Sequence, residues 1–200
     1  MNHETLIFEN EGIQNTEATL DAAAKRARKL GINQLVVATT TGGTALACAE
    51  RMQDLKIAAV TMHAIDREIR VMRHGEKLRA KDPALMEKAR RAGVQFYTGV
   101  HPFRGAVSSA LHEALGGYSA HDVLAHSVMH WFSTGMKVAI ECSLMAADGG
   151  LLDVSRDAIA LGGYRGGADT AVVLKPAYSY RMFELKIREI LAFPRERTGE

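Results

Sequence analysis

Residues 36–50 read VVATTTGGTALACAE, and this stretch predicts the fold of the chain. The run QLVVAT at 34–39 is short, apolar and β-branched, which is typical of a strand covered on both faces of a sheet. A helix is predicted to open at Thr44, and KIAAVT at 56–61 forms a second buried strand. Strand, helix and strand within about thirty residues make a βαβ unit, whose crossover is almost always right-handed. The sequence therefore predicts an α/β fold with parallel strands.

Similar patterns continue on both sides of this unit. Asn15 is predicted to cap a helix that begins at Thr16, and Gly31 is predicted to end it. Residues 185–193, LKIREILAF, alternate in charge and indicate an edge strand. Further helices are predicted at 83–92, 104–115, 119–132 and 137–147, and further strands at 94–97, 158–161 and 170–177. Together these elements predict one α/β domain over residues 1–200, a three-layer α/β/α arrangement around a mostly parallel sheet.

The composition is typical of a soluble globular protein. With 47% hydrophobic and 24% charged residues, a chain of 200 residues can bury one core. The net charge of +2 is small and basic residues are mixed with acidic ones, so no nucleic-acid partner is expected. No apolar run suits a membrane helix, and the N-terminal residues lack the apolar core of a signal peptide. Cys48 and Cys142 lie in apolar runs, as expected for reduced thiols of a cytoplasmic protein.

The loop between the first buried strand and its helix consists of threonine and glycine alone. Such a loop presents free backbone N–H groups at the positive end of a helix dipole. Glycines let an anion approach the backbone, and threonine hydroxyls add uncharged donors. The loop matches neither a Walker motif nor a dinucleotide GxGxxG motif. It predicts a phosphate site made of Thr39, Thr40, Thr41, Gly42, Gly43 and Thr44. The alternative is an ordinary turn in which Thr44 caps the helix.

The segment ATTTGGTALACAERMQDLKIAAVT at 38–61 resembles the C-terminal domain of pyruvate kinase. In that domain a strand leads into a Ser/Thr-rich loop with Gly-Thr, then into a helix and an apolar strand that ends in Val-Thr. In regulated pyruvate kinases the loop holds a phosphate of a sugar-bisphosphate effector. The resemblance therefore implies the same fold and a phosphate-binding loop in this chain.

The chain is also similar to a family of stand-alone archaeal and bacterial proteins of about this length. The shared motifs are Asn-Thr before the first helix, Met-Ala-Ala-Asp followed by Gly-Leu, a glycine loop ending in Ala-Asp-Thr-Ala, and Arg-Glu-Ile near the end. They stand here at 15–16, 145–151, 162–171 and 188–190. Catalysis is not implied, because pyruvate kinase chemistry resides in a separate barrel domain for which 200 residues leave no room. We therefore expect that the chain is not a pyruvate kinase.

Residues 162–170 form a second glycine loop, between two predicted strands. Its glycines indicate an awkward turn or the close approach of a ligand. Arg165 could hold a phosphate, and Asp169 could accept a hydrogen bond from a sugar or ribityl hydroxyl. Because the carboxyl ends of parallel strands line one crevice, the two loops are predicted to lie side by side. The alternative is a glycine-rich hairpin with Asp169 as a turn residue. The predicted ligand residues of this loop are Gly162, Gly163, Arg165, Gly166, Gly167 and Asp169.

Histidines and buried acids supply weaker candidates. His63 and His101 each follow a predicted strand, which suits either a binding or acid/base role or a structural hydrogen bond, and His63 is included in the predicted site. His126 and His130 lie four apart on a helix, but no third ligand accompanies them and no metal site is predicted. Glu141 and Asp148 interrupt apolar runs and are expected to have structural partners, with a functional carboxylate as the alternative for each.

Residues 66–82 are dense in charge and richer in arginine than the family pattern. They are predicted to be either a solvated surface segment or a lid that closes over a phosphate. The whole sequence favours binding of a phosphate-bearing small molecule, either a mononucleotide such as FMN or a sugar phosphate. The alternatives are an enzyme that acts on a phosphorylated metabolite and a regulatory or assembly module. No catalytic residue is assigned. A homo-oligomer is expected, because the apolar helices after residue 104 exceed what one sheet face needs.

Overall fold

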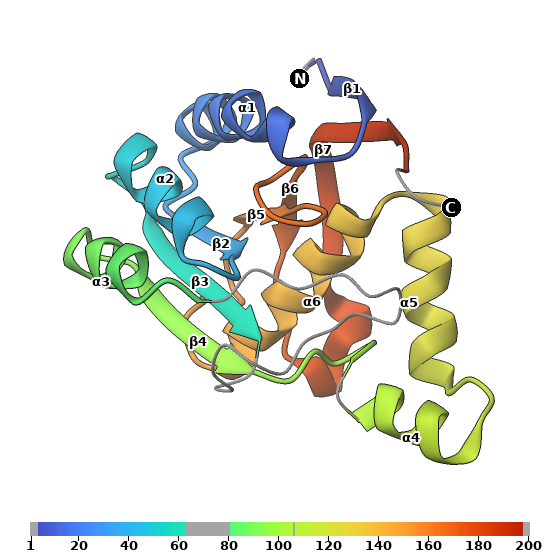
Figure 1. The fold of residues 1–200 in the computed structure, drawn as a ribbon. Helices are drawn as coiled ribbons and strands as arrows, with labels where there is room; N and C mark the ends of the chain where they lie inside the picture. The colour runs from blue at the N-terminus through green and yellow to red at the C-terminus, as the bar shows by residue number, and fades with distance from the viewer. Residues whose placement is uncertain (1–3, 63–80, 106, 198–200) are drawn as a thin grey trace.

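The computed structural model describes residues 4–62, 81–105 and 107–197. A seven-stranded sheet forms its centre (Figure 1), with the strand order β1-β7-β6-β5-β2-β3-β4. Strand β6 is antiparallel to both of its neighbours, and every other pair of adjacent strands is parallel. The predicted mostly parallel α/β fold is therefore confirmed. The strands are β1 (Leu6–Asn10), β2 (Gln34–Ala38), β3 (Lys56–Met62), β4 (Gln95–Gly99), β5 (Ala158–Gly162), β6 (Thr170–Lys175) and β7 (Lys186–Glu196).

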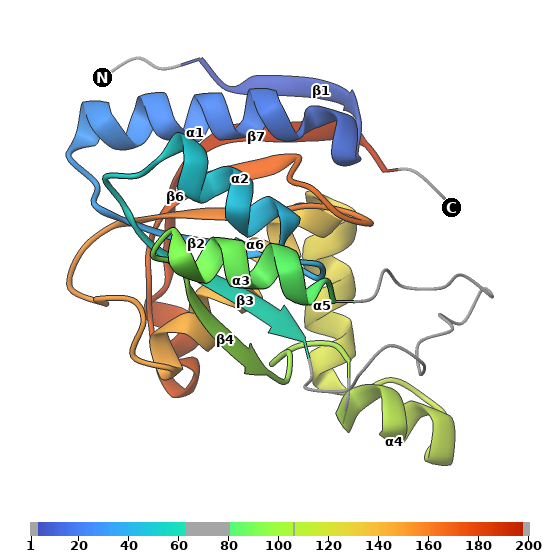
Figure 2. The ribbon, with the colours of Figure 1, turned by 60° about the vertical axis from the view of Figure 1, so that its left-hand side comes forward.

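Helices cover both faces of the sheet and complete the three layers (Figures 1 and 2). Helices α1 (Thr16–Leu30), α2 (Gly43–Arg51) and α3 (Pro83–Arg91) lie on one face. Helix α6 (Thr134–Asp148) covers the other face, and α5 (Ala120–Trp131) packs outside α6. The remaining helical segments are α4 (Val107–Leu115) and the two 3-10 helices η1 (Ile13–Asn15) and η2 (Ser179–Glu184).

Two apolar layers, one on each side of the sheet, hold the fold together. Alternate residues of β2 face opposite layers: Leu35 and Val37 pack toward α1 and α2, and Val36 packs toward α6. All three side chains are fully buried, which explains why this strand is a continuous apolar run. Helix α6 is buried around most of its surface because the sheet lies on one side and α5 on the other. Cys48 and Cys142 are free and buried, as expected for core thiols, and burial raises the pKa of both.

Two local predictions are wrong. Strand β7 is not an edge strand, because β1 pairs with it in parallel and forms the edge of the sheet. Asn15 stands at the N-cap position of α1 as predicted, but its side chain does not cap the helix: its backbone is already helical, and its amide donates to the carbonyl of Asn10 at 2.8 Å. The opposite end of α1 is as predicted, since Gly31 adopts the left-handed conformation at φ 66° that favours glycine.

Within the described residues, no helix combines the length and the apolar character needed to cross a bilayer. Most of the charge-dense segment at 66–82 lies outside the described residues, which resume at Lys81.

Candidate functional site at the carboxyl edge of the sheet

The carboxyl ends of β2, β3, β4 and β5 meet at one edge of the sheet. Strands β2 and β5 are direct parallel neighbours, with Val37 opposite Leu161. The Thr/Gly loop after β2 and the glycine loop after β5 therefore leave the sheet side by side, as expected. Such an edge is where open α/β sheets bind their ligands.

Two of the threonines in the Thr/Gly loop cap the helix that follows. The hydroxyl of Thr39 accepts from the N–H of Gly42 at 3.1 Å, and that of Thr41 accepts from the N–H of Gly43 at 3.2 Å. Gly42, rather than Thr44, is the N-cap residue of α2, and it has a positive φ of 100°. These contacts fix the loop and orient the first turn of α2.

The remaining donors of the loop are not used by the described part of the chain. The backbone N–H groups of Thr44 and Ala45 stand in the first turn of α2, where no carbonyl four residues back accepts from them. Among the described residues, the hydroxyls of Thr40 and Thr44 also have no hydrogen-bond partner. The loop thus presents uncharged donors at the positive end of a helix.

Helix α3 closes one side of this loop. A Cβ added to Gly42 would lie 2.9 Å from the backbone nitrogen of Met86, so only glycine allows the two helices to approach this closely. The N–H of Asp82 donates to the carbonyl of Thr41 at 3.1 Å, and the Asp82 carboxylate caps α3. The described end of the predicted lid segment therefore contacts the loop directly.

The second loop uses most of its polar groups on its own chain. One carboxylate oxygen of Asp169 accepts from the N–H groups of Gly12 and Tyr164, at 3.0 and 3.3 Å. The other accepts from the hydroxyl of Thr170 at 2.8 Å. Burial raises the pKa of Asp169, and these hydrogen bonds oppose the rise. Asp169 is thus a buried tie between the β5–β6 connection and the segment before α1.

Close approach of the chain to itself explains the glycines of this loop. A Cβ on Gly162 would lie 2.0 Å from the carbonyl oxygen of Gly135, at the start of α6. One on Gly167 would lie 2.2 Å from the hydroxyl of Thr16, and one on Gly163 would lie 2.8 Å from the Gly167 carbonyl. Only Gly166 has open space, with its nearest atom at 4.0 Å.

Arg165 is the one cation of the second loop. Its side chain is exposed, and its guanidinium lies 4.8 Å from the centre of the Tyr164 ring. Its backbone is left-handed, with φ 55°, which is unusual for a residue with a side chain. The last predicted site residue, His63, lies outside the described residues.

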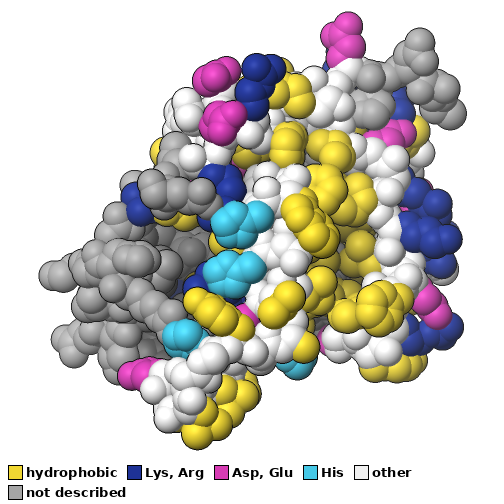
Figure 3. All heavy atoms as spheres, turned by 90° about the vertical axis from the view of Figure 1, so that its right-hand side faces the viewer, with side chains coloured by type: hydrophobic (Ala, Val, Ile, Leu, Met, Phe, Trp, Pro, Cys, Tyr) yellow, Lys and Arg dark blue, Asp and Glu magenta, His cyan; other side chains and the backbone are white. Residues whose placement is uncertain are grey.

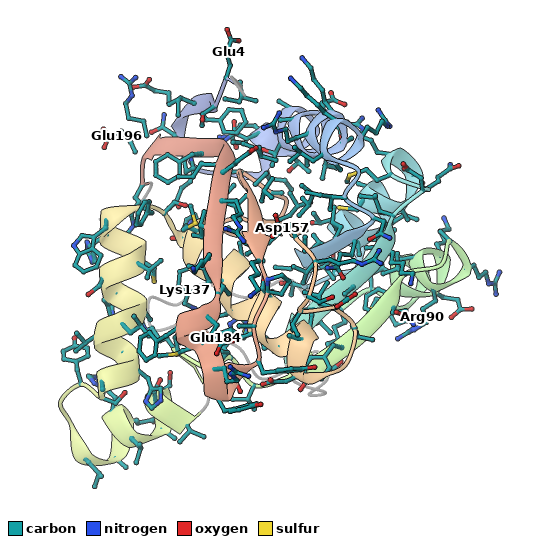
Figure 4. All side chains as sticks on the ribbon, turned by 180° about the vertical axis from the view of Figure 1, so that it is seen from behind. Glu4, Arg90, Lys137, Asp157, Glu184 and Glu196 are labelled. Carbon is teal, nitrogen blue, oxygen red and sulfur yellow. The ribbon has the colours of Figure 1, made fainter. Side chains whose placement is uncertain are left out.

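A buried cluster around Glu141 lies at the same edge and was not predicted as a site. Glu141 accepts from Nδ1 of His101 at 2.7 Å and from Lys137 at 2.5 Å. Its other oxygen accepts from the N–H groups of Phe103 and Arg104, at 2.9 and 3.0 Å. Figure 4 shows Lys137 within the outline of the molecule, whereas Glu4, Arg90 and Glu196 project at its border.

The charges of this cluster balance one another. Burial alone would raise the pKa of Glu141, but the hydrogen bond from His101 and the charge of Lys137 outweigh it, and the pKa lies below its usual value. The expectation that Glu141 has a structural partner is met. In the sequence, the one available signal was a Lys and a Glu four apart on a helix that is otherwise apolar.

The histidines of α5 contact each other, and the described residues place no further metal-binding side chain with them. The rings of His126 and His130 stack at 6.0 Å. Burial lowers the pKa of His126, and the charges of Arg104 and His130 lower it further. Within the described ranges, no group of three or more His, Cys, Asp or Glu side chains could hold a metal ion.

Comparison with known proteins gives a family match and several similar structures. The family model described as the α/β domain of pyruvate kinase matches residues 17–174. A pyruvate kinase from Cryptosporidium parvum is 15% identical, with a TM-score of 0.42, over 83% of this chain and 23% of that one. A C. parvum pyruvate kinase in complex with ADP is 16% identical, with a TM-score of 0.39, over 90% of this chain and 24% of that one. The chain therefore spans about a quarter of the length of the pyruvate kinases it matches.

Proposed function

We propose that this chain, which belongs to the family of pyruvate kinase α/β domains, binds a phosphate-bearing small molecule at the Thr/Gly loop. The ligand is a mononucleotide such as FMN or a sugar phosphate. One observation carries the proposal: the loop keeps the hydroxyls of Thr40 and Thr44, and the N–H groups of Thr44 and Ala45, unpaired among the described residues.

The arrangement suits a phosphate for electrostatic reasons. A phosphate is acceptor-rich and anionic, so it satisfies several donors at once and is stabilised by the helix dipole. Hydrogen bonds to a charged group contribute about 1.5 to 3 kcal/mol each. The hydroxyls of Thr39 and Thr41 already hold the loop in shape, so little of it has to be ordered when the ligand binds.

The second loop supplies the neighbouring wall of this site. In the proposal the exposed Arg165 adds a cation to the phosphate, because its loop leaves the sheet next to the Thr/Gly loop. The protein works in the cytoplasm, where the buried free thiols Cys48 and Cys142 stay reduced. Its role is that of a ligand-binding or sensing protein.

The test compares ligands that differ only in their phosphate. The freshly purified chain is analysed by native mass spectrometry, then by thermal shift with FMN against riboflavin and with glucose 6-phosphate against glucose. We expect a shift with at least one phosphorylated member of these pairs and none with its unphosphorylated partner. At a free ligand concentration about 100 times Kd, binding adds about 2.7 kcal/mol to the folded state.

The matched variants are chosen from the hydrogen bonds of the loop. Thr40→Val combined with Thr44→Val removes only hydroxyls that have no partner among the described residues, and the loss of two hydrogen bonds to a charged group should weaken binding at least about 100-fold. Thr98→Val, at an exposed position of β4, is the control and should leave binding unchanged. If no copurified ligand is found and neither phosphate compound stabilises the chain, the binding proposal fails.

An enzyme is the second candidate, and one contact favours it. Because His101 Nδ1 lies 2.7 Å from Glu141, its other nitrogen, Nε2, is available to take or give a proton. Among the described residues, Nε2 has no hydrogen-bond partner. Since β3 alone separates β2 from β4, the ends of these strands are about 10 Å apart, which is within the span of a sugar phosphate.

Phosphorus and proton NMR of the same phosphorylated compounds, incubated with the chain, test this candidate. A product that forms with the unmodified chain, and is lost in His101→Gln but retained in Thr98→Val, would establish catalysis. Unchanged spectra for both compounds would show that the chain does not convert them, and would leave binding as the proposed function.

A further inference from the structure

The outer face of α5 and the turn before it expose large apolar side chains. Trp131 is 74% exposed, Tyr118 67% and Val123 58%. Figure 3 shows hydrophobic and histidine side chains gathered on this side of the molecule. Single exposed apolar residues are common, but a contiguous group of them usually marks an interaction surface.

These side chains border one hollow instead of standing apart. A hollow of about 410 Å³ is lined by Tyr118, Val123, His126, Ser127, His130 and Trp131. We call these six residues the α5 face. The ring of Tyr118 meets that of His126 edge-on at 5.9 Å. The lining positions recur at intervals of three and four residues along α5, which places them on one side of the helix.

The α5 face carries no formal charge at its centre. Asp122 is the single Asp, Glu, Lys or Arg in α5, and it is 4% exposed. Its carboxylate faces inward to the helix start, where it accepts from the N–H and the hydroxyl of Ser119, at 3.0 and 2.7 Å. Two arginines stand beside the hollow and are not part of its lining: Arg197, whose guanidinium lies 3.1 Å from Nδ1 of His130, and Arg104, whose charge lowers the pKa of His126.

We propose that the α5 face binds the same face of a second copy of this chain, with the two α5 helices antiparallel across a two-fold axis. In such an interface a group close to the two-fold axis faces its own symmetry mate, so a charge there would meet a like charge. An uncharged face avoids this repulsion, and the antiparallel arrangement opposes the two helix dipoles. The cations near this face, Arg104 and Arg197, stand at the border of the hollow and not in its lining, so charge is not what selects the partner at its centre.

The exposed area is of the size that a dimer requires. Trp131, Tyr118 and Val123 together leave on the order of 400 Å² of side chain open in one copy. A stable interface buries about 800 Å² from each partner, of which the apolar centre is roughly half to two thirds. The two histidines and Ser127 add polar groups to the same face. The proposal is independent of the phosphate site, because the two surfaces share no residue.

The test uses the only tryptophan of the chain, Trp131, as its reporter. Sedimentation velocity and tryptophan emission are measured on the full chain from about 1 to about 100 µM. We expect a dimer, and an emission maximum that moves to shorter wavelength as the dimer forms and the indole leaves water. Val123→Glu places two carboxylates near the axis and should weaken dimerisation at least tenfold; Ser127→Arg gives a second, oppositely charged variant.

Val100→Glu is the matched control, because Val100 is 53% exposed and lies outside the hollow. It should dimerise like the unmodified chain, and circular dichroism should show all variants folded. Two results would overturn the proposal. One is an unmodified chain that stays monomeric at every concentration, with the emission of an exposed indole, which would leave the face to a different kind of partner. The other is a dimer that is equally tight in both α5-face variants.

Discussion

The two glycine-rich loops at the carboxyl edge of the sheet have similar compositions but use their polar groups in opposite ways. In the loop after β2, two threonines cap α2 and leave the donors of Thr40, Thr44 and Ala45 without partners among the described residues. In the loop after β5, Asp169 ties the loop to Gly12 and Tyr164. The first loop is held by its own hydrogen bonds and still has donors to spare. The second loop is held by hydrogen bonds that use its carboxylate.

A cluster of glycines indicates a close approach to the backbone, but it does not say whether the neighbour is a ligand or the chain itself. At Gly162 and Gly167 that neighbour is the chain itself, and at Gly42 it is helix α3. The donors left over once the chain's own contacts have been made are therefore a better indicator of a ligand than the glycines. By this criterion the Thr/Gly loop is the stronger candidate.

The largest effect is expected from Gly162→Ala. Its Cβ would lie 2.0 Å from the Gly135 carbonyl oxygen and 2.9 Å from the Ala139 nitrogen, and neither backbone atom can move freely. We expect a loss of about 4 kcal/mol or more in the free energy of unfolding, measured by urea denaturation. Gly166→Ala, in the same loop but with open space around it, should cost only about 1 to 2 kcal/mol for its left-handed backbone. Equal losses would mean that self-packing does not explain these glycines.

The next largest effect is expected from Glu141→Gln, which extends the comparison to the adjacent end of β4. The change leaves Lys137 buried without its counter-charge, and should cost about 3 to 5 kcal/mol near neutral pH. The pKa of Glu141 is lowered, so the unfolded chain binds its proton more tightly than the folded protein does. Its stabilisation is therefore complete above the unfolded pKa of about 4.3 and is lost as the pH falls through the lower, folded value.

Urea denaturation of both proteins between about pH 7 and about pH 3 measures this dependence. The stability gap between the unmodified chain and Glu141→Gln should narrow as the pH falls below about 4. A gap that stays constant down to the lowest pH would show that the cluster does not stabilise the ionised carboxylate.

A smaller effect on stability is expected from Asp169→Ala. The change leaves the partly buried N–H groups of Gly12 and Tyr164 without an acceptor, at a cost of about 2 to 3 kcal/mol. Asp169→Asn should cost about 1 kcal/mol, since its carbonyl can face both N–H groups and its amide can face the Thr170 hydroxyl. FMN affinity is measured beside stability. If Asp169→Asn kept full stability and lost binding, the carboxylate would serve the ligand instead of the chain's own contacts, and Asp169 would belong to the ligand site.

The smallest effect is expected from Arg165→Ala. An exposed guanidinium contributes about 0.2 to 1 kcal/mol to an ionic contact, so FMN should bind about 1.5- to 5-fold more weakly, with a weaker dependence on salt. The unfolding free energy should change by less than about 0.5 kcal/mol. Isothermal titration at low and high salt measures the affinity and its salt dependence, and urea denaturation measures the unfolding free energy. An unchanged affinity would separate the second loop from the phosphate site.

The order and type of the elements followed from local patterns in the sequence. The fully buried β2 and β3 are continuous apolar runs, and α1 ends at a glycine that adopts the expected left-handed conformation. These features depend on side-chain periodicity and on backbone freedom, which are properties of neighbouring residues. The Thr/Gly loop could be found for the same reason, since a strand, a loop and a helix lie within one short segment.

Contacts between residues that are distant in the chain could be read only from the tertiary structure. The sequence did not reveal that β1 covers the edge of β7, or that Glu141 joins His101, forty residues away. Composition likewise did not reveal that the second loop presses against residues 12–16. Pairing, burial and steric approach depend on residues that are distant in the chain, so no local pattern encodes them. Local sequence is enough to place the donors and glycines along the chain, and packing fixes which of them pair with the chain's own residues.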